Sequence, residues 1–336
     1  MIREAIAKLV RSEDLSRAEV ELAMEEIMTG QALPAQIGSF LTAMRMKGET
    51  IEEIVGAAVI MRKHVTRIKT RHPVILDTCG TGGDESQTFN VSTIAAFVVA
   101  GAGIAVAKHG NRCVSSKCGS ADLLKELGVN IETEEHAVSR CLDEIGVGFL
   151  FAPALHKAMQ YAVGPRREIG IRTMFNILGP LTNPAGATHQ LLGVYDYKLT
   201  KPVAQALGEL GSKHALVVHG DDGLDEVTTS DSTQVSELKG GKVTSYEITP
   251  MEFGIRKSKP GELKGGDASQ NAKIAIAVLS GEKGPQRDIV IINAGCAIYA
   301  ADGAKSIKEG IEIAEESIES GEGLKKLEQL KEATDR

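Results

Sequence analysis

The stretch VILDTCGTGGDESQTFNVST, Val74–Thr93, decides how the fold of this chain is interpreted. Its apolar start, Val74–Asp77, has the length of a buried strand, and a glycine-rich loop follows directly. A strand, a glycine loop and a helix in this order present backbone N–H groups to a phosphate, because glycine lets a ligand approach and a helix N-terminus favours an anion. The stretch therefore predicts either a phosphate site or a tight turn between a strand and a helix.

Two common phosphate-binding motifs do not fit this loop. A Walker loop ends in Gly-Lys-Ser/Thr, whereas Gly83 is followed here by Asp84 and Glu85. The dinucleotide fingerprint requires its last glycine at the position of Glu85. We therefore expect neither a P-loop NTPase nor a Rossmann dehydrogenase.

Composition narrows the class of partner. The 336 residues carry a net charge of −7 and include no Trp, which argues against a general nucleic-acid surface and against binding to anionic membranes. The N-terminus lacks the apolar core of a signal peptide, and the five cysteines form no C-x-x-C pair, as expected for the reduced thiols of a cytoplasmic protein. The longest uncharged run, 89–107, is interrupted by Gly101 and Gly103, so we expect a buried helix followed by a buried strand rather than a membrane span.

The first seventy residues predict helices only, with capping-box patterns at Ser16/Glu19 and Thr50/Glu53. From Val74 on, short apolar runs alternate with helical stretches, which indicates a mainly parallel sheet covered by helices. The expected strands are Val74–Asp77, Ile104–Lys108, Val147–Phe151, Gln190–Tyr195, Ala215–His219 and Ile289–Asn293. The expected helices among them are Thr93–Ala102, Ala121–Leu127, Glu134–Ile145, Lys201–Leu210 and Ala268–Leu279.

Two segments depart from this alternation. Polar alternation and the pair Gly240-Gly241 predict an antiparallel hairpin within 227–248. The segment 164–186 is helical in its first half and broken by prolines afterwards, and we expect it to return to the helical unit because a structureless loop of this length is unusual. The sequence thus predicts an α/β fold in two domains. A small all-helical domain comprises 1–70 with 164–186, and a larger α/β domain comprises 71–163 with 187–336.

Basic and hydroxyl side chains follow the second expected strand, 104–108. Ligands of parallel sheets bind beyond the carboxyl ends of the strands, so these side chains should face the same crevice as the glycines. Lys108 and Arg112 would neutralise a phosphate, and His109 and Asn111 lie between them in the sequence. Hydroxyl donors to the phosphate oxygens follow at Ser115, Ser116 and Ser120.

An acidic turn, GDDGLDE, follows the expected strand 215–219. Magnesium is commonly bound by one or two carboxylates together with substrate phosphates, and the pair Asp225 and Glu226 is suited to this. A solvated turn is the alternative interpretation for either acid. Glycines, basic groups and an acid pair in one crevice would suit a phosphorylated sugar whose pyrophosphate leaves with the help of magnesium.

Seven motifs, in order along nearly the whole chain, resemble those of the anthranilate phosphoribosyltransferase family. They are MRMKGET (44–50), GTGGD (80–84), NVST (90–93), KHGNR (108–112), GSAD (119–122), RREIGIRTMFNILGPLTNPA (166–185) and LDE (224–226). The resemblance implies transfer of the phosphoribosyl group of phosphoribosyl pyrophosphate (PRPP) to anthranilate, with release of pyrophosphate, as a step of tryptophan biosynthesis. It also implies the nucleoside phosphorylase class II fold and a homodimer formed through the helical domain.

Carried over motif by motif, the resemblance also implies roles for individual residues. PRPP would be bound by Gly80, Gly83, Asp84, Thr88, Asn90, Ser92, Thr93, Lys108 and Ser120; Val91 of the same NVST motif, with Arg112, Ser115 and Ser116, completes the expected donor site. Anthranilate would be bound by Gly80, His109, Asn111 and Arg166. His109 would orient the acceptor or accept a proton, with a purely structural contact as the alternative. Ser92, Asp225 and Glu226 would hold magnesium, as two ions.

The chain departs from the family pattern at two places. Gly164-Pro165 stands where the family commonly has Pro-Val, so either Arg166 or Arg167 faces the acceptor. Gln160 replaces a frequent lysine, which leaves tolerance for substituted anthranilates open. The alternative enzyme is a pyrimidine nucleoside phosphorylase of the same fold, which should lack an acid pair for magnesium. A catalytically inactive relative that binds nucleic acid is disfavoured by the net charge of −7.

Overall fold

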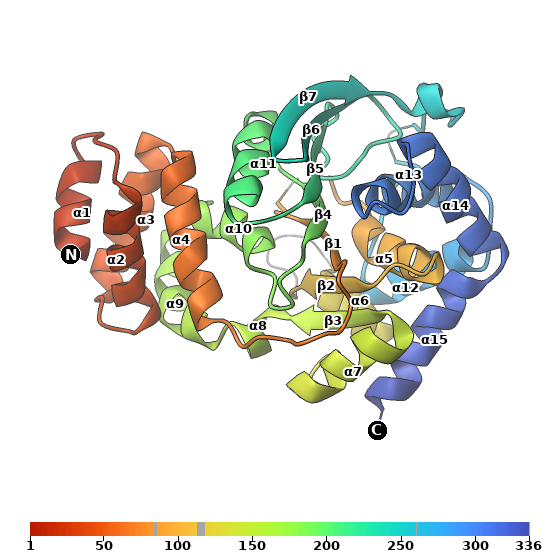
Figure 1. The fold of residues 1–336 in the computed structure, drawn as a ribbon, viewed down its shortest axis with the longest axis horizontal. Coiled ribbons are helices and arrows are strands. Elements are labelled where there is room, and N and C mark those ends of the chain that lie inside the picture. Colours follow the sequence, from red (N-terminus) through yellow and green to blue (C-terminus); the bar gives the residue numbers. More distant parts are fainter. Residues whose placement is uncertain (84–85, 113–117, 260, 336) are drawn as a thin grey trace.

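The computed structural model describes residues 1–83, 86–112, 118–259 and 261–335. A group of helices forms one end of the molecule, and a twisted sheet surrounded by further helices forms the rest (Figure 1). The N-terminal helices are α1 (Ile2–Leu9), α2 (Arg17–Met28), α3 (Pro34–Lys47) and α4 (Ile51–His64). The two predicted capping boxes, Ser16/Glu19 and Thr50/Glu53, are confirmed at the starts of α2 and α4.

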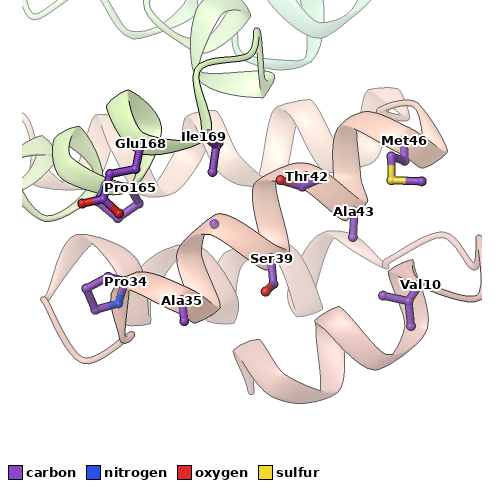
Figure 2. A pocket seen from close by; sticks show the side chains of 11 residues that line it. Val10, Pro34, Ala35, Ser39, Thr42, Ala43, Met46, Pro165, Glu168 and Ile169 are labelled. Carbon is purple, nitrogen blue, oxygen red and sulfur yellow. The ribbon is translucent and has the colours of Figure 1, made fainter.

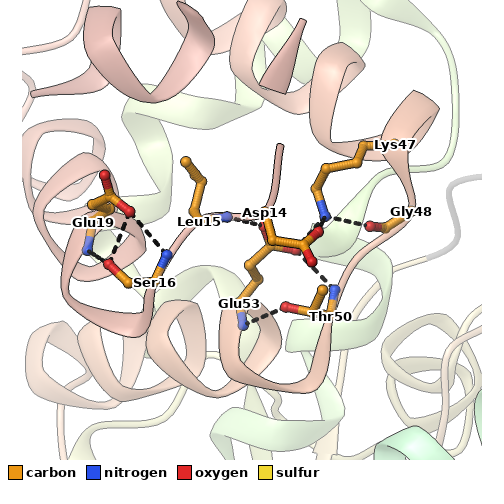
Figure 3. A network of polar contacts seen from close by, with 8 residues as sticks. All are labelled: Asp14, Leu15, Ser16, Glu19, Lys47, Gly48, Thr50 and Glu53. Carbon is orange, nitrogen blue, oxygen red and sulfur yellow. Dashed lines mark hydrogen bonds and ion pairs between the residues drawn. The ribbon is translucent and has the colours of Figure 1, made fainter. Parts of the chain in front are cut away.

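The second capping box belongs to a buried ion pair that joins three helices (Figure 3). Glu53 is fully buried, and its carboxylate accepts hydrogen bonds from the backbone N–H groups of Leu15 and Thr50 at 2.9 and 2.8 Å. Lys47 Nζ lies 2.9 Å from the same carboxylate and also contacts Asp14. A buried charge is tolerated only when it is paired and hydrogen-bonded, and here that requirement fixes the start of α2 and the junction of α3 with α4.

A seven-stranded sheet has the order β3-β2-β1-β4-β5-β6-β7. The strands are β1 (Leu76–Gly80), β2 (Val106–Gly110), β3 (Val147–Phe151), β4 (His189–Gly193), β5 (His214–Gly220), β6 (Thr233–Lys239) and β7 (Lys242–Ile248). The first five in chain order are parallel, and β6 and β7 form the predicted antiparallel hairpin around Gly240-Gly241. The expected α/β class with a mainly parallel sheet is confirmed.

Helices cover both faces of the sheet. Alternate residues of β5 belong to different hydrophobic clusters. Leu216 and Val218 share a cluster with α5 (Val91–Gly101) and α13 (Pro285–Ala300), whereas Ala215 and Val217 share one with α11 (Thr200–Glu209) and the N-terminal helices. The remaining helices are α5 (Val91–Gly101), α6 (Ser120–Glu126), α7 (Glu135–Ile145), α8 (Ala152–Leu155), α9 (Gln160–Ile169), α10 (Met174–Leu178), α11 (Thr200–Glu209), α12 (Ala268–Leu279), α13 (Pro285–Ala300), α14 (Ile307–Glu319) and α15 (Glu322–Thr334). Short 3-10 turns lie at Lys157–Met159, Pro180–Thr182, Tyr197–Leu199 and Pro250–Phe253.

The predicted strand Ile289–Asn293 is wrong, because these residues lie inside helix α13. Almost every residue of this helix from Ile289 to Ala300 is buried, so it lacks a polar face and the 3.6-residue period is lost. A short apolar run is then indistinguishable from a buried strand. The predicted buried helix and strand in the uncharged run 89–107 are confirmed as α5 and the start of β2, and across the described ranges no helix is long and apolar enough to cross a bilayer.

Helices α9 and α10 return to the N-terminal helices, and α9 begins at Gln160, four residues before the predicted segment. Met174, Phe175 and Leu178 share a buried cluster with Phe40 and Ile54. This packing supports a discontinuous helical domain, and its division as 1–70 with 164–186 stays a prediction.

Candidate active site

The carboxyl ends of the parallel strands gather the candidate residues at one edge of the sheet. Gly80, the last residue of β1, is in register with Gly193, the last residue of β4. The glycine loop continues from β1, and the acidic turn continues from β5. Ligands of parallel sheets bind at such an edge. As expected from the sequence, the glycine loop and the acidic turn lie together there.

Asp225 is held against the glycine loop. Its Oδ2 accepts a hydrogen bond from the backbone N–H of Gly82 at 2.7 Å. A side chain at Gly80 would collide with the Asp225 carboxylate, and a side chain at Gly193 would collide with the Asp225 backbone. Glycine at 193 is therefore required for the backbone of the acidic turn to lie this close, and glycine at 80 leaves room for the Asp225 carboxylate in its observed position.

Lys108 lies beneath the loop, with only 4% of its surface exposed. Its Nζ donates to the carbonyl of Thr78 at 2.5 Å and to Ser92 Oγ at 3.3 Å. Burial lowers the pKa of Lys108, against the opposing effect of Asp77 and Glu226. Lys108 was expected to end the second strand and His109 to follow it. Both lie within β2, because this buried strand includes polar residues that have internal partners.

The first turn of α5 faces the acidic turn. The N–H of Ser92 donates to Glu226 Oε1 at 3.1 Å, and Thr78 Oγ1 donates to the Ser92 carbonyl at 3.0 Å. Thr93 Oγ1 is buried and has no hydrogen-bond partner among the described residues. An eleven-residue helix presents its N-terminus here, which favours an anion, so a phosphate oxygen would suit the Thr93 hydroxyl.

Asn90 and Thr88 are fixed by residues that sequence reasoning missed. Asn271 Nδ2, from α12, donates to Asn90 Oδ1 at 3.1 Å, and Asn90 Nδ2 donates to the Cys118 carbonyl. Thr88 forms an isolated bridge with Lys264. Asn271 is 181 residues from Asn90, and no motif marks it. Val91, the remaining predicted donor contact of this stretch, begins α5 with its N–H bonded to the Phe89 carbonyl.

The segment after β2 carries Asn111 and Arg112, which are both exposed. Ser120 Oγ donates to the Asn111 carbonyl at 3.3 Å. The Arg112 guanidinium donates to Glu132 at 3.0 Å and lies 5.7 Å from the Phe151 ring centroid, so in this structure it is engaged away from the glycine loop. Three predicted donor-site residues, Asp84, Ser115 and Ser116, lie outside the described residues.

His109 and His156 form a buried pair with their Nε2 atoms 3.1 Å apart. Burial, followed by the neighbouring His156, lowers the pKa of His109 to about 3. Burial alone lowers the pKa of His156 to about 4. One ring donates and the other accepts at this distance, and the Nδ1 atom of His156 has no partner among the described residues. Both rings are therefore neutral at pH 7.

Arg166 is half-buried in α9, with Cζ 5.1 Å from the ring centroid of Phe175 in α10, whereas Arg167 is exposed. Burial lowers the pKa of Arg166 below its ordinary value. Sequence reasoning missed Arg172, whose guanidinium donates to the carbonyl of Gly83. It lies within the GIRT part of the 166–185 motif, which was the only sequence feature that could have marked it.

The oxygen donors at this edge fit a magnesium ion bound together with a phosphorylated ligand. Asp225 and Glu226 supply two carboxylates, and Ser92 supplies a hydroxyl group between Lys108 and the helix N-terminus. Over the part of the chain that the structure describes, no group of three or more His, Cys, Asp or Glu side chains is arranged to hold a metal. A cation here would thus need further oxygens from phosphate and water, which is the usual coordination of magnesium.

The buried pair His109 and His156 should take up no proton between pH 8 and pH 5 in the folded protein. Imidazole resonances followed by NMR, and assigned with His109→Gln and His156→Gln, should stay at their neutral positions over this range. Folded pKa values below the ordinary 6.5 mean that the unfolded chain binds more protons as the pH falls. As the pH falls from 6.5 towards the folded pKa of about 3 for His109 and about 4 for His156, each ring should therefore reduce the free energy of unfolding by up to about 1.4 kcal/mol per pH unit. A midpoint near pH 6 for either ring would contradict this.

Comparisons with known proteins agree with this geometry. Residues 72–324 match the α/β domain of a glycosyl transferase family, and residues 3–65 match the helical bundle domain of such a family. Anthranilate phosphoribosyltransferase of Moorella thermoacetica is 56% identical over 330 residues, covering 98% of this chain and 97% of that protein.

Solved structures give the same result. The crystal structure of anthranilate phosphoribosyltransferase from Thermus thermophilus superposes with a TM-score of 0.94 at 41% identity, covering 99% of both chains. The Saccharomyces cerevisiae enzyme in complex with PRPP and Mg superposes with a TM-score of 0.90 at 31% identity, covering 99% of this chain and 98% of that one, and it has also been solved with 4-fluoroanthranilate. This chain therefore belongs to the anthranilate phosphoribosyltransferase family of glycosyl transferases.

Proposed function

We propose that this protein transfers the phosphoribosyl group of PRPP to the amine of anthranilate in tryptophan biosynthesis. The amine nitrogen bonds to ribose C1 as the bond from C1 to pyrophosphate breaks, and the amine loses one proton. The observation that carries the proposal is the gathering of the glycine loop, Lys108 and the acid pair Asp225 and Glu226 at one sheet edge, in a chain 56% identical to an enzyme of this name. Neither the acid pair nor this relative supports the alternative function, that of a pyrimidine nucleoside phosphorylase.

The donor would be bound by the glycine loop and the first turn of α5. Gly80 and Gly83 expose backbone to the pyrophosphate, and Thr93 and Lys108 lie beside the helix N-terminus. Asp225, Glu226 and Ser92 would hold magnesium, as two ions; when bound, magnesium neutralises the negative charge that develops on the leaving pyrophosphate. A yeast relative solved with PRPP and Mg supports this choice of metal.

The acceptor would lie between β2 and α9. Arg166, which is half-buried, supplies a cation for the anthranilate carboxylate, and Asn111, Gly80 and His109 would complete the contact. A ring with a pKa of about 3 is a weak proton acceptor at neutral pH, so His109 is better suited to orient the amine than to deprotonate it. The yeast relative solved with 4-fluoroanthranilate supports an aromatic acid in this role.

Replacing both Asp225 and Glu226 with alanine should abolish magnesium-dependent turnover. Anthranilate consumption with PRPP, followed by anthranilate fluorescence, should fall by roughly 100-fold or more, because the leaving group loses its metal-mediated stabilisation. Asp221→Ala is the matched control, since Asp221 is an exposed acid of the same turn. Full activity of the double variant, or an equal loss in the control, would contradict the metal assignment.

Replacing Arg166 with alanine should raise the KM for anthranilate by about 10- to 100-fold, the equivalent of one charge-assisted hydrogen bond, with little change in the KM for PRPP. Arg167→Ala is the control, because Arg167 lies next in the sequence and is exposed. If Arg167→Ala raises the anthranilate KM instead, the other arginine faces the acceptor.

A homodimer through the helical domain is also proposed. A groove of about 690 Å³ lies between α3 and α9 in the helical part of the molecule (Figure 2). Its lining residues are Val10, Pro34, Ala35, Gly38, Ser39, Thr42, Ala43, Met46, Pro165, Glu168 and Ile169. Val10 and Met46 are 66% and 83% exposed, and apolar side chains gathered on one face are typical of a protein interface.

Met46→Glu should shift this protein toward the monomer in sedimentation experiments, because a charge would be buried at the interface. Met251→Glu is the control, since Met251 is similarly exposed, at 68%, but lies in the α/β part. A monomeric wild type, or an unchanged dimer in Met46→Glu, would contradict this interface. We expect the protein in the cytoplasm, with small-molecule ligands and neither nucleic acid nor membrane as partner.

A further inference from the structure

Arg172 lies between the two halves of the proposed site, and the function described above gives it no role. Its guanidinium donates to the Gly83 carbonyl and stacks on Tyr195, with Cζ 4.8 Å from the ring centroid. A Cβ atom at Gly83 would lie 3.1 Å from Arg172 Nε. A side chain that follows α9 is thus packed directly on the glycine loop.

On the acceptor side, Arg172 and Arg166 belong to one compact segment. Helix α9 ends at Ile169 and turns at Gly170, which has a left-handed φ of +63°. Helix α10 begins after Thr173, whose N–H donates to Asn176 Oδ1 at 3.0 Å. The Arg166 guanidinium in turn lies over Phe175 of α10. Both arginines therefore contact or flank the start of α10.

On the donor side, the glycine loop is attached to the sheet just before Gly83. The N–H of Thr81 donates to the Gly193 carbonyl at 2.9 Å, and Thr81 Oγ1 accepts from the Tyr195 N–H at 3.1 Å. The N–H of Gly82 donates to Asp225. Arg172 therefore meets the loop where it leaves the sheet, and Tyr195 supports both the loop and the guanidinium.

We propose that Arg172 is a positioning residue that couples donor binding to acceptor binding, an inference that rests on the proposed function. Pyrophosphate bound to the loop would fix the Gly83 carbonyl, and the fixed carbonyl holds Arg172 and, through α10, Arg166. Each ligand then orders part of the site that the other needs, so each binds more tightly when the other is present, by the same factor. Arginine suits this position because its planar group donates a hydrogen bond while it stacks on an aromatic ring, which lysine does less well.

The test is a titration of anthranilate, followed by its fluorescence, with and without magnesium pyrophosphate. This probe carries the leaving group of the donor but has no ribose to transfer. Wild type should bind anthranilate about tenfold more tightly with the probe present, within the usual range of such couplings. Arg172→Ala should bring the ratio of the two Kd values to about one, and Arg172→Lys should restore it in part. Arg167→Ala, the exposed control, should keep the wild-type ratio.

A purely structural role for Arg172 predicts a different result. It would lower the thermal midpoint, or weaken anthranilate binding equally with and without the probe, and leave the ratio unchanged. Equal ratios in wild type and Arg172→Ala, or a ratio of one in wild type, would overturn the inference. Failure of the proposed function is seen separately, as no consumption of anthranilate by the wild type with PRPP, whatever the ratio.

Discussion

The close approach of Asp225 to two glycines is the constraint on which the site depends. Gly80 and Gly193 end neighbouring strands, and the turn after β5 packs onto both because neither has a side chain. This packing brings a carboxylate to a loop that we propose binds pyrophosphate. The Asp225 carboxylate and a bound pyrophosphate are both negatively charged, so they would repel each other at such short range unless a cation lies between them. We therefore propose that a divalent metal takes part in donor binding.

A second constraint lies below the loop, where one buried carboxylate joins the two halves of the site. Asp77 accepts hydrogen bonds from the His109 N–H at 3.1 Å and from Asn183 Nδ2 at 2.8 Å. Burial raises the pKa of Asp77 to about 6, although the bond from Asn183 acts in the opposite direction, so the group is mainly ionised at pH 7. Asn183 also donates to the Ala107 carbonyl. The segment that carries Arg166 is therefore anchored to the strand that carries Lys108 and His109.

Local patterns in the sequence predicted the parts of this site that depend on neighbours in the chain. Strand, glycine loop and helix start follow one another within twenty residues, and capping boxes lie within four. The order of these three elements in Val74–Thr93 and the capping box Thr50/Glu53 were therefore predicted correctly, although β1 runs from Leu76 to Gly80 and not from Val74 to Asp77. Partners distant in the sequence leave no such pattern, which is why Asn271 and the contact of Arg172 with Gly83 were missed. Complete burial also removes the alternation of polar and apolar residues that marks a helix, which is why part of helix α13 was predicted as a strand.

The basic groups of the proposed site differ in charge: the two histidines are neutral, and Arg166 is a cation. Positive charge develops at ribose C1 as pyrophosphate departs, and a protonated imidazole at the proposed acceptor site would oppose that charge. Burial keeps His109 and His156 neutral, and Lys108 is engaged by the Thr78 carbonyl and Ser92. A permanent cation remains at Arg166, which we propose lies at the anthranilate carboxylate, away from the reacting amine. The proton that the amine loses is then better accepted by water or by the departing pyrophosphate than by a ring whose pKa is about 3. We infer that the histidine pair serves the reaction by staying uncharged.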